Sequence, residues 1–343
     1  MVMESMSKKK RLAISMALAL GTILPPFGGT VSAGGTTEID ANDSAPAWGG
    51  SSSDDAVTVD GYTLILKSIV TNYTGELYGG RHLGEGDVKN NTLKIESGAV
   101  LNAAGYGGFV AGGTPQLKGS AIENHVIVDG GTAGTIYGGM TKTKDGDASK
   151  NTVEINDNST INGSVYGGAI DNDYTDIDTD VKENKVTLRG TKATTTVTGD
   201  IIGGYVKTSA NDVMNNVVTI EGGKVSGDVF GAKIGDDGYA ENNVVTMSGD
   251  SEVRSLIGGY VEDQGHANNN TVSLQAGKVT GDVAGGLAGT SGSADAKNNT
   301  VTITGGKVGD TVYGGWAKGT GTATGNTVTI TGGKIDEVYG GYS

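Results

Sequence analysis

The chain has no cysteine, so its stability must come from a continuous core and not from disulfide bonds. Only 4 of its 343 residues are proline, which excludes a proline-rich linker. After the N-terminal region no hydrophobic segment is long enough to span a bilayer, so we expect no membrane span there. What the chain has in abundance is glycine, with 61 residues that can supply the positive φ angles of tight corners.

Reactive side chains are few and scattered. The 3 histidines, His82, His125 and His266, lie too far apart in the chain for us to expect a shared metal ion. Neither a Gly-x-Ser-x-Gly elbow nor a Gly-x-x-x-x-Gly-Lys-Ser/Thr phosphate loop occurs. The densest acidic run, Asp171–Asp180, lacks the glycine and glutamate of a helix-loop-helix calcium site, and we interpret it as a solvated loop. We therefore expect no catalytic site, no cofactor and no metal ion.

The dominant pattern is the tripeptide Tyr-Gly-Gly, or a near copy of it, which recurs ten times at intervals of 26 to 36 residues. Each copy follows a short apolar stretch and precedes a polar loop. A period in this range is typical of stacked-repeat proteins. The first glycines of the copies are Gly79, Gly107, Gly138, Gly167, Gly203, Gly231, Gly258, Gly285, Gly314 and Gly340.

A second pattern runs at the same pace, an asparagine followed by a short alternating stretch such as Thr-Val-Thr-Ile. The alternation predicts a strand with Val and Ile on one face and Thr on the other. Stacked carboxamides can hydrogen-bond from repeat to repeat, and asparagine tolerates a left-handed corner, so we interpret these residues as a structural ladder and not as ligands. They are Asn91, Asn124, Asn151, Asn184, Asn216, Asn243, Asn270, Asn299 and Asn326.

No single repeat can bury its own apolar face, whereas parallel strands of neighbouring repeats can pair and enclose a core. The sequence therefore predicts an all-β fold, a parallel β-helix (β-solenoid) of about ten coils over residues 57–343. Each coil should contain three short strands and one variable loop. Two half-length turns for each repeat fit the spacing less well.

The residue before the Gly-Gly pair is often aromatic and forms a second predicted ladder. If the preceding aliphatic residues point inward, alternation turns these rings outward, where they can stack on one another or meet a sugar or a protein. Simple stacking is the favoured interpretation. The ladder consists of Tyr78, Tyr106, Tyr137, Tyr166, Phe230, Tyr313 and Tyr339.

The N-terminus has the three parts of a secretory signal peptide. Lys8–Arg11 is basic, Leu12–Leu24 is apolar but too short to span a bilayer, and Val31-Ser-Ala33 supplies small residues at the cleavage position. We expect cleavage after residue 33 and a flexible polar lead-in over residues 34–56. Without the leader the net charge is −17, which argues against a nucleic-acid partner.

The signal peptide followed by copies of Asn-Thr-Val-Thr-Ile-x-Gly-Gly-Lys-Val and Val-Tyr-Gly-Gly resembles the passenger region of bacterial autotransporters and related surface adhesins. The resemblance covers about residues 57–343 and implies a right-handed β-helix displayed at the cell surface or outer membrane. It also implies an adhesin without catalytic activity that binds a host-surface glycan or protein.

Two partner expectations follow from the resemblance. No translocator barrel follows residue 343 in this sequence, so we expect the outer-membrane translocator to be supplied elsewhere or to have been lost by truncation. We also expect self-association through the uncapped C-terminal coil. The alternatives are a surface-layer or matrix filament and, less favoured, a β-helical enzyme that degrades polysaccharides.

Overall fold

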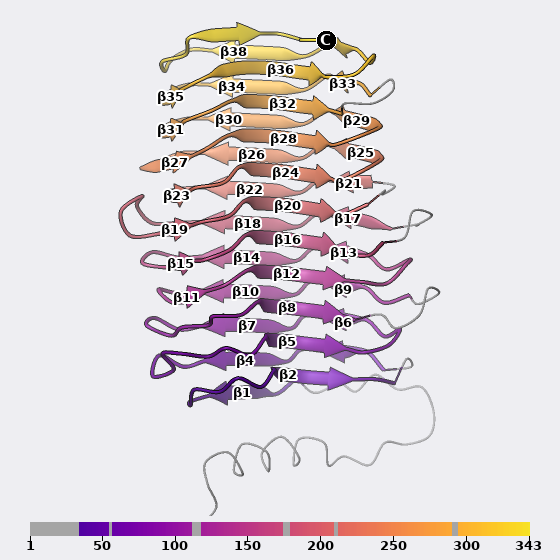
Figure 1. The fold of residues 1–343 in the computed structure, drawn as a ribbon, viewed down its shortest axis with the longest axis vertical. Coiled ribbons are helices and arrows are strands. Elements are labelled where there is room, and N and C mark those ends of the chain that lie inside the picture. Colours follow the sequence, from indigo (N-terminus) through magenta and orange to yellow (C-terminus); the bar gives the residue numbers. More distant parts are fainter. Residues whose placement is uncertain (1–33, 55–56, 112–117, 174–178, 209–211, 290–293) are drawn as a thin grey trace, which may run out of the picture. The chain divides into compact units, whose positions relative to one another are not determined.

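The computed structural model describes residues 34–54, 57–111, 118–173, 179–208, 212–289 and 294–343. These residues form β-strands and no α-helix, and strands of successive coils pair in parallel (Figure 1). The all-β, right-handed parallel β-helix of about ten coils is confirmed. Within the ranges described, no helix is long and apolar enough to cross a membrane.

A full coil crosses four sheets, one more than the three strands expected for each coil. The front sheet and the back sheet, named for their positions in Figure 1, have eleven strands each. The left sheet has seven strands, and the right sheet has eight, with a separate pair beyond them. The fourth strand escaped prediction because most strands of the left and right sheets have only two or three residues, too few to show alternation.

The strands have the following bounds. Those of the front sheet are β2 (Ala47–Ser52), β5 (Leu77–His82), β8 (Gly105–Val110), β12 (Ile136–Thr141), β16 (Val165–Ile170), β20 (Ile201–Val206), β24 (Val229–Ile234), β28 (Leu256–Val261), β32 (Val283–Ala288), β36 (Thr311–Ala317) and β39 (Glu337–Tyr339). Those of the back sheet are β1 (Thr36–Ile39), β4 (Thr63–Leu66), β7 (Thr92–Ile95), β10 (His125–Val128), β14 (Thr152–Ile155), β18 (Lys185–Leu188), β22 (Val217–Ile220), β26 (Val244–Met247), β30 (Thr271–Leu274), β34 (Thr300–Ile303) and β38 (Thr327–Ile330). Those of the left sheet are β11 (Thr132–Ala133), β15 (Thr160–Ile161), β19 (Thr196–Val197), β23 (Gly223–Val225), β27 (Ser251–Val253), β31 (Lys278–Val279) and β35 (Lys307–Val308). Those of the right sheet are β3 (Val59–Asp60), β6 (Val88–Lys89), β9 (Ala121–Ile122), β13 (Ala148–Ser149), β17 (Asp180–Lys182), β21 (Asp212–Met214), β25 (Gly238–Glu241) and β29 (Gly265–Asn268), followed by the pair β33 (Ala296–Lys297) and β37 (Ala323–Thr324).

The core is a set of aliphatic columns that run along the solenoid. In β14, Val153 and Ile155 are completely buried, whereas Thr152 and Glu154 lie on the outer face. The register places equivalent residues of neighbouring coils opposite one another, so Val153 pairs with Val186 of the next coil. Alternation within a strand and identity between strands therefore act together to fill the interior.

One residue in most coils has a left-handed backbone, and it immediately precedes the asparagine of the ladder. The non-glycine examples have φ between 52° and 59°. The sequence interpretation assigned left-handed tolerance to the ladder asparagine itself, whereas the structure places it one residue earlier. The residues are Asn90, Glu123, Lys150, Glu183, Asn215, Asn242, Asn269 and Asn298, with Gly61 and Gly325 at the equivalent positions of the second and last coils.

The expected flexible lead-in over residues 34–56 is wrong for the part that the structure describes. Residues 34–54 form the first coil, because β1 pairs with β4 and β2 pairs with β5. The copy was missed because Trp48-Gly-Gly stands where later coils have Tyr-Gly-Gly. Because of this additional coil, the front sheet has eleven strands although the sequence has only ten copies of Tyr-Gly-Gly. The predicted signal peptide, residues 1–33, lies outside the described residues.

Replacing Lys150 with asparagine should stabilise the fold by about 0.5–1 kcal/mol, because asparagine adopts the left-handed backbone at lower cost than lysine. The Lys150 ammonium lies 3.9 Å from Glu123 at an exposed position, so losing this pair should matter little. Urea unfolding measures the change. Lys185→Asn, at the first residue of a back strand, is the matched control and should give no gain. Equal effects of the two substitutions would contradict the assignment.

Candidate interaction surface

The nine predicted asparagines stand immediately before successive strands of the back sheet, one in each coil from the third to the last. Eight of them are completely buried. Asn326, in the last coil, is half-buried. A buried carboxamide requires partners for both of its N–H groups and for its oxygen.

Each ladder asparagine before Asn326 satisfies this requirement through its neighbours. The Asn151 Nδ2 donates to Oδ1 of Asn184 at 3.0 Å and to the carbonyl of Ala121 at 2.9 Å. Its backbone N–H also donates to Oδ1 of Asn184, at 2.9 Å. Its own oxygen accepts the backbone N–H and the Nδ2 of Asn124, at 3.0 and 3.1 Å. Every polar group of the side chain is therefore used within the stack, which leaves none for a ligand.

The ladder has a direction. The backbone N–H and one Nδ2 hydrogen donate to the asparagine of the next coil, and the oxygen accepts from the asparagine of the previous one. The other Nδ2 hydrogen donates to a backbone carbonyl of the previous coil. In the second coil Tyr62 takes the asparagine position directly before β4, and its backbone N–H donates to Oδ1 of Asn91 at 2.9 Å. In the first coil Gly35 precedes β1 at the equivalent position. The first two coils therefore contribute no carboxamide to the series.

The Gly-Gly pair is explained by close packing. Neither Gly138 nor Gly139 has a positive φ. A Cβ added to Gly139 would lie 2.4 Å from the carboxamide of Asn151, and one added to Gly138 would lie 2.4 Å from the carbonyl oxygen of Gly167. The pair thus gives the asparagine side chain room against the front strand. Ala232 is an exception at the second position, so one coil accommodates a methyl group.

The predicted aromatic ladder lies in the front sheet, on the outer side. Its inner neighbours, such as Leu77 and Ile136, are completely buried, as the prediction assumed. Tyr78, Tyr106, Tyr137 and Tyr166 stack in sequence with centroid distances of 4.9, 4.9 and 4.7 Å and interplanar angles of 10° or less. Because their faces cover one another, these rings have little free face to offer a sugar.

The later members of the ladder are separated from this stack. Phe230 lies between coils that carry Ile202 and Ile257 at the same position. Tyr313 and Tyr339 stack with each other at 5.6 Å in the last two coils, beyond Ala284. The complete first column is Trp48, Tyr78, Tyr106, Tyr137, Tyr166, Ile202, Phe230, Ile257, Ala284, Tyr313 and Tyr339.

A second outer column, which the sequence interpretation missed, lies beside the first. Strict alternation would turn the residue after Gly-Gly inward, but Phe109 packs against Tyr78 at 5.3 Å and Trp316 against Tyr313 at 4.6 Å. The first glycine of each pair has no register partner, so the alternation is interrupted there. The recurrence of large residues directly after Gly-Gly was the available signal. The column is Ser51, Arg81, Phe109, Met140, Ala169, Tyr205, Lys233, Tyr260, Leu287, Trp316 and Tyr342.

The two columns together form what we call the aromatic face. Both halves contain closed and partly accessible side chains. Tyr106 and Phe230 are 7% and 4% exposed. Tyr137 and Tyr166 are half-buried, as are Tyr205, Tyr260 and Trp316. Tyr342, in the last coil, is 46% exposed and is the most accessible ring of the face.

Positively charged side chains lie over rings of the aromatic face at three places. The Arg81 guanidinium lies 5.0 Å from the ring centre of Tyr78 and 5.7 Å from that of Trp48. Lys233 lies over Phe230 at 5.0 Å, and Lys318 over Trp316 at 4.6 Å. These contacts add cation–π attraction and place positive charge beside the rings on an acidic chain.

Burial changes the acidity of the stacked phenols. It raises the pKa of Tyr106 and Tyr137 well above the ordinary value of 10.0. It does the same for Tyr78, which is assisted by a hydrogen bond to Glu76. The pKa of Tyr73, a core residue, rises to about 12 for the same reason. The neutral rings are thus part of the folded structure at ordinary pH.

The histidines do not converge in the structure. His82 is buried, and its Nδ1 accepts the backbone N–H of Gly84 at 2.9 Å. His125 begins a back strand beside Glu154, and His266 lies in the right sheet and packs against Tyr239. The acidic run is described only in part: residues 174–178 lie outside the described residues, and Asp171 pairs with lysines of the coils on either side.

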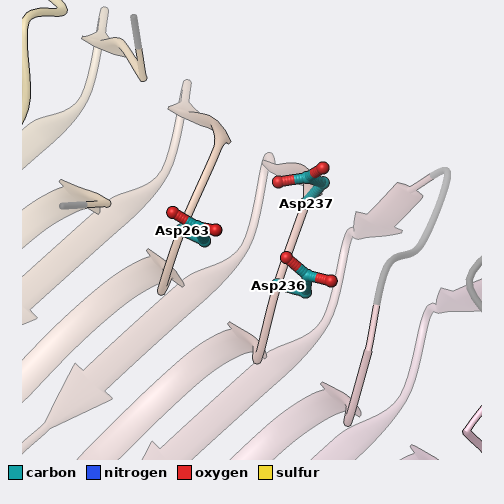
Figure 2. A group of neighbouring side chains, drawn as sticks. All are labelled: Asp236, Asp237 and Asp263. Atoms are coloured by element: carbon teal, nitrogen blue, oxygen red, sulfur yellow. The ribbon is translucent and has the colours of Figure 1, made fainter. Parts of the chain in front are cut away.

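Three carboxylates that the sequence interpretation did not single out lie close together on two neighbouring corner turns (Figure 2). Asp236 and Asp237 follow β24, and Asp263 follows β28. One oxygen of each lies within 4.8 Å of the others. Such a set could hold a divalent cation. Asp237 is exposed and already accepts the backbone N–H of Gln264 at 3.0 Å, whereas Oδ1 of Asp263 is buried and has no hydrogen-bond partner among the described residues.

The fold defines the class of protein as a parallel β-solenoid with an asparagine ladder. No family model matches the chain, and neither the curated proteins nor the solved structures contain a match to it.

Asn184→Ala should destabilise the protein by about 3–5 kcal/mol, because it leaves two donors of Asn151 and the carbonyl of Ala148 without partners in the interior. Asn102→Ala is the matched control. Asn102 donates to Asn72 at 2.8 Å on the exposed surface, and its loss should change stability by less than about 0.5 kcal/mol. Chemical unfolding compares the two. A cost for Asn184 no larger than that for Asn102 would refute the ladder.

Alkali should unfold the protein above pH 10. Burial raises the pKa of the stacked tyrosines, so the folded state holds their protons more tightly than the unfolded state does. The resulting stabilisation is complete below the unfolded pKa of 10.0 and is lost as the pH rises through the folded value. Phenolate absorbance should show native tyrosines that ionise at higher pH than in urea-unfolded chain. If the tyrosines of the native and the unfolded chain titrate along the same curve, the stacked tyrosines are not buried and the prediction fails.

Proposed function

We propose that this chain is an exported, surface-displayed β-solenoid that acts as a non-catalytic, adhesin-type interaction protein. The predicted signal peptide and the resemblance to autotransporter passengers support export and display at the cell surface. The acidic composition favours a partner other than nucleic acid. The partner in this proposal is a glycan or a protein of a host surface, and an outer-membrane translocator delivers the chain.

The observation that carries the proposal is the cluster of four rings in the last two coils of the aromatic face. Tyr313, Trp316, Tyr339 and Tyr342 form a cluster in which each ring contacts at least two others, at centroid distances of 4.6 to 5.9 Å. Exposed tyrosine and tryptophan are the residues that most often contribute the binding energy of protein interfaces, and their rings also stack on sugars. Lys318 beside Trp316 adds a positive charge at the edge of the cluster.

The arrangement suits a large and flat partner. Outward positions repeat from coil to coil at the strand spacing of about 4.8 Å, so a binding group that recurs along a glycan or a protein can meet the rings of the last two coils at once. Weak contacts made in parallel then yield useful overall affinity. The part of the face where Tyr78 to Tyr166 cover one another serves stability in this proposal.

Replacing both Tyr313 and Trp316 with alanine should reduce binding to host cells or to an immobilised glycan panel at least about tenfold, because hot-spot aromatic residues contribute 2 kcal/mol or more. Binding of the labelled chain is measured by flow cytometry and on the panel. Thr302→Ala, on the back sheet of the same coil, is the matched control and should bind like the wild type.

Three results would contradict the proposal. Equal binding by the double variant and the control would remove the aromatic face from the interaction. Self-assembly of the wild type into filaments without any binding would favour the matrix-filament alternative. Release of reducing or unsaturated sugar from polysaccharides would replace the interaction protein with an enzyme.

A further inference from the structure

The aromatic face contains a continuous series of ring contacts between five tyrosines. We call it the tyrosine stack, and its members are Tyr78, Tyr106, Tyr137, Tyr166 and Tyr205. The first four rings are nearly parallel, and Tyr205, from the second column, lies 5.3 Å from Tyr166 with an interplanar angle of 55°. Tyrosine, tryptophan and cysteine are the side chains that give up one electron most readily, and the chain has no cysteine to compete. Because electron transfer weakens steeply with distance, rings in contact exchange an electron far faster than rings in different parts of the fold.

The two ends of the tyrosine stack differ in access from the solvent. Tyr78 and Tyr106 are only 3% and 7% exposed. The other three rings, Tyr137, Tyr166 and Tyr205, are half-buried. A reagent in solution can therefore take an electron directly from the half-buried rings, whereas the first two rings are reached through the stack.

The closed end of the stack contains a proton acceptor. The Tyr78 hydroxyl donates to Oε2 of Glu76 at 2.5 Å, and the Tyr106 hydroxyl donates to Oε1 of the same carboxylate at 3.4 Å. A phenol–carboxylate hydrogen bond as short as the first is charge-assisted and strong. An oxidised phenol is a strong acid, and at a buried position its proton can move only to a group that already accepts its hydrogen bond. Among the described residues, no carboxylate accepts a hydrogen bond from Tyr137 or Tyr166.

Arg81 favours loss of that proton. Its guanidinium lies 5.0 Å from the ring centre of Tyr78 and opposes a second positive charge on the ring. Transfer of the proton to Glu76 removes this charge, because the products are a neutral phenoxyl radical and a neutral carboxylic acid. Burial and the hydrogen bond to Glu76 raise the pKa of Tyr78 well above 10.0, so the phenol keeps its proton at ordinary pH until it is oxidised. Tyr78 is therefore the ring on which an oxidised stack forms a neutral radical.

We propose that the tyrosine stack is a redox-active site that carries an oxidising equivalent from a strong one-electron oxidant in solution, such as a high-valent metal complex, to Tyr78. The oxidant gains one electron from a half-buried ring, and each ring regains an electron from its neighbour nearer Tyr78. At Tyr78 the O–H bond breaks as the electron leaves, and the proton forms an O–H bond with Oε2 of Glu76. The net step reduces the oxidant by one electron and converts Tyr78 to its radical. This activity is separate from the binding of a host surface.

The test oxidises the full chain with a photogenerated ruthenium(III) polypyridyl complex and freezes it for high-field electron paramagnetic resonance. The spectrum distinguishes a phenoxyl oxygen that accepts a hydrogen bond from one that does not. All proteins carry Tyr339→Phe, because Tyr339 also donates to a glutamate, Glu337, at 2.5 Å and would give a similar signal.

Four variants are compared in this background. Tyr78→Phe keeps the ring without the phenol, and Glu76→Gln keeps the shape without the basic carboxylate. Tyr137→Ile breaks the stack in the middle. The column already contains isoleucine at Ile202 and Ile257, so the fold accommodates this side chain. Tyr239→Phe is the matched control, because Tyr239 is 46% exposed and lies outside the stack. Circular dichroism before oxidation confirms that each variant is folded.

The parent protein should show a hydrogen-bonded tyrosyl radical as its main signal. Tyr78→Phe and Glu76→Gln should each lose this signal. Tyr137→Ile should lose most of it and retain a radical without the hydrogen bond, and Tyr239→Phe should match the parent. The proposal is overturned if the signal survives Tyr78→Phe or Glu76→Gln, if Tyr137→Ile leaves it at full intensity, or if Tyr239→Phe removes it. None of these readouts depends on host-cell binding, so failure here and failure of the proposed function are distinguishable.

Discussion

The carboxamide ladder is the interaction on which the rest of the structure depends. From the third coil onward, a buried amide finds an acceptor in the asparagine of the next coil, and this constrains the register of neighbouring strands. The ladder also explains two features of the repeat. The Gly-Gly pair leaves space for the side chain, and the preceding left-handed residue turns it into the interior.

The ladder inside the solenoid aligns the strands of neighbouring coils, so the residues on the outer surface are aligned in the same register. Any residue type that recurs at an outward position becomes a column along the solenoid, as the tyrosines do. The columns can then be stabilising or available to a partner according to their packing. Tyr106 is closed between its neighbours, whereas Tyr342, which contacts Trp316 on the same face, is exposed. A constant interior with a variable exterior is the arrangement expected of a surface interaction module.

Much of the fold was predictable because identical chemistry recurs at fixed spacing. The back strands, the inward aliphatics and the asparagine ladder all followed from alternation and period. Besides the fourth strand of each coil and the position of the left-handed residue, three features did not. The first coil was hidden because Trp48 replaces tyrosine, and the second aromatic column because the Gly-Gly pair interrupts alternation. The ladder's direction could not be predicted, because sequence does not show which way each amide donates. The structure shows this direction in pairs such as Asn299 and Asn326.

Side-chain amide hydrogen exchange of the ladder asparagines, followed by NMR on selectively 15N-labelled chain, tests this account most directly. The carboxamides from Asn91 to Asn299 are buried and doubly bonded, so they should exchange only as slowly as the core unfolds. Those of Asn326 and the exposed Asn102 should exchange far faster. Fast exchange throughout the interior asparagines would show that no continuous ladder exists.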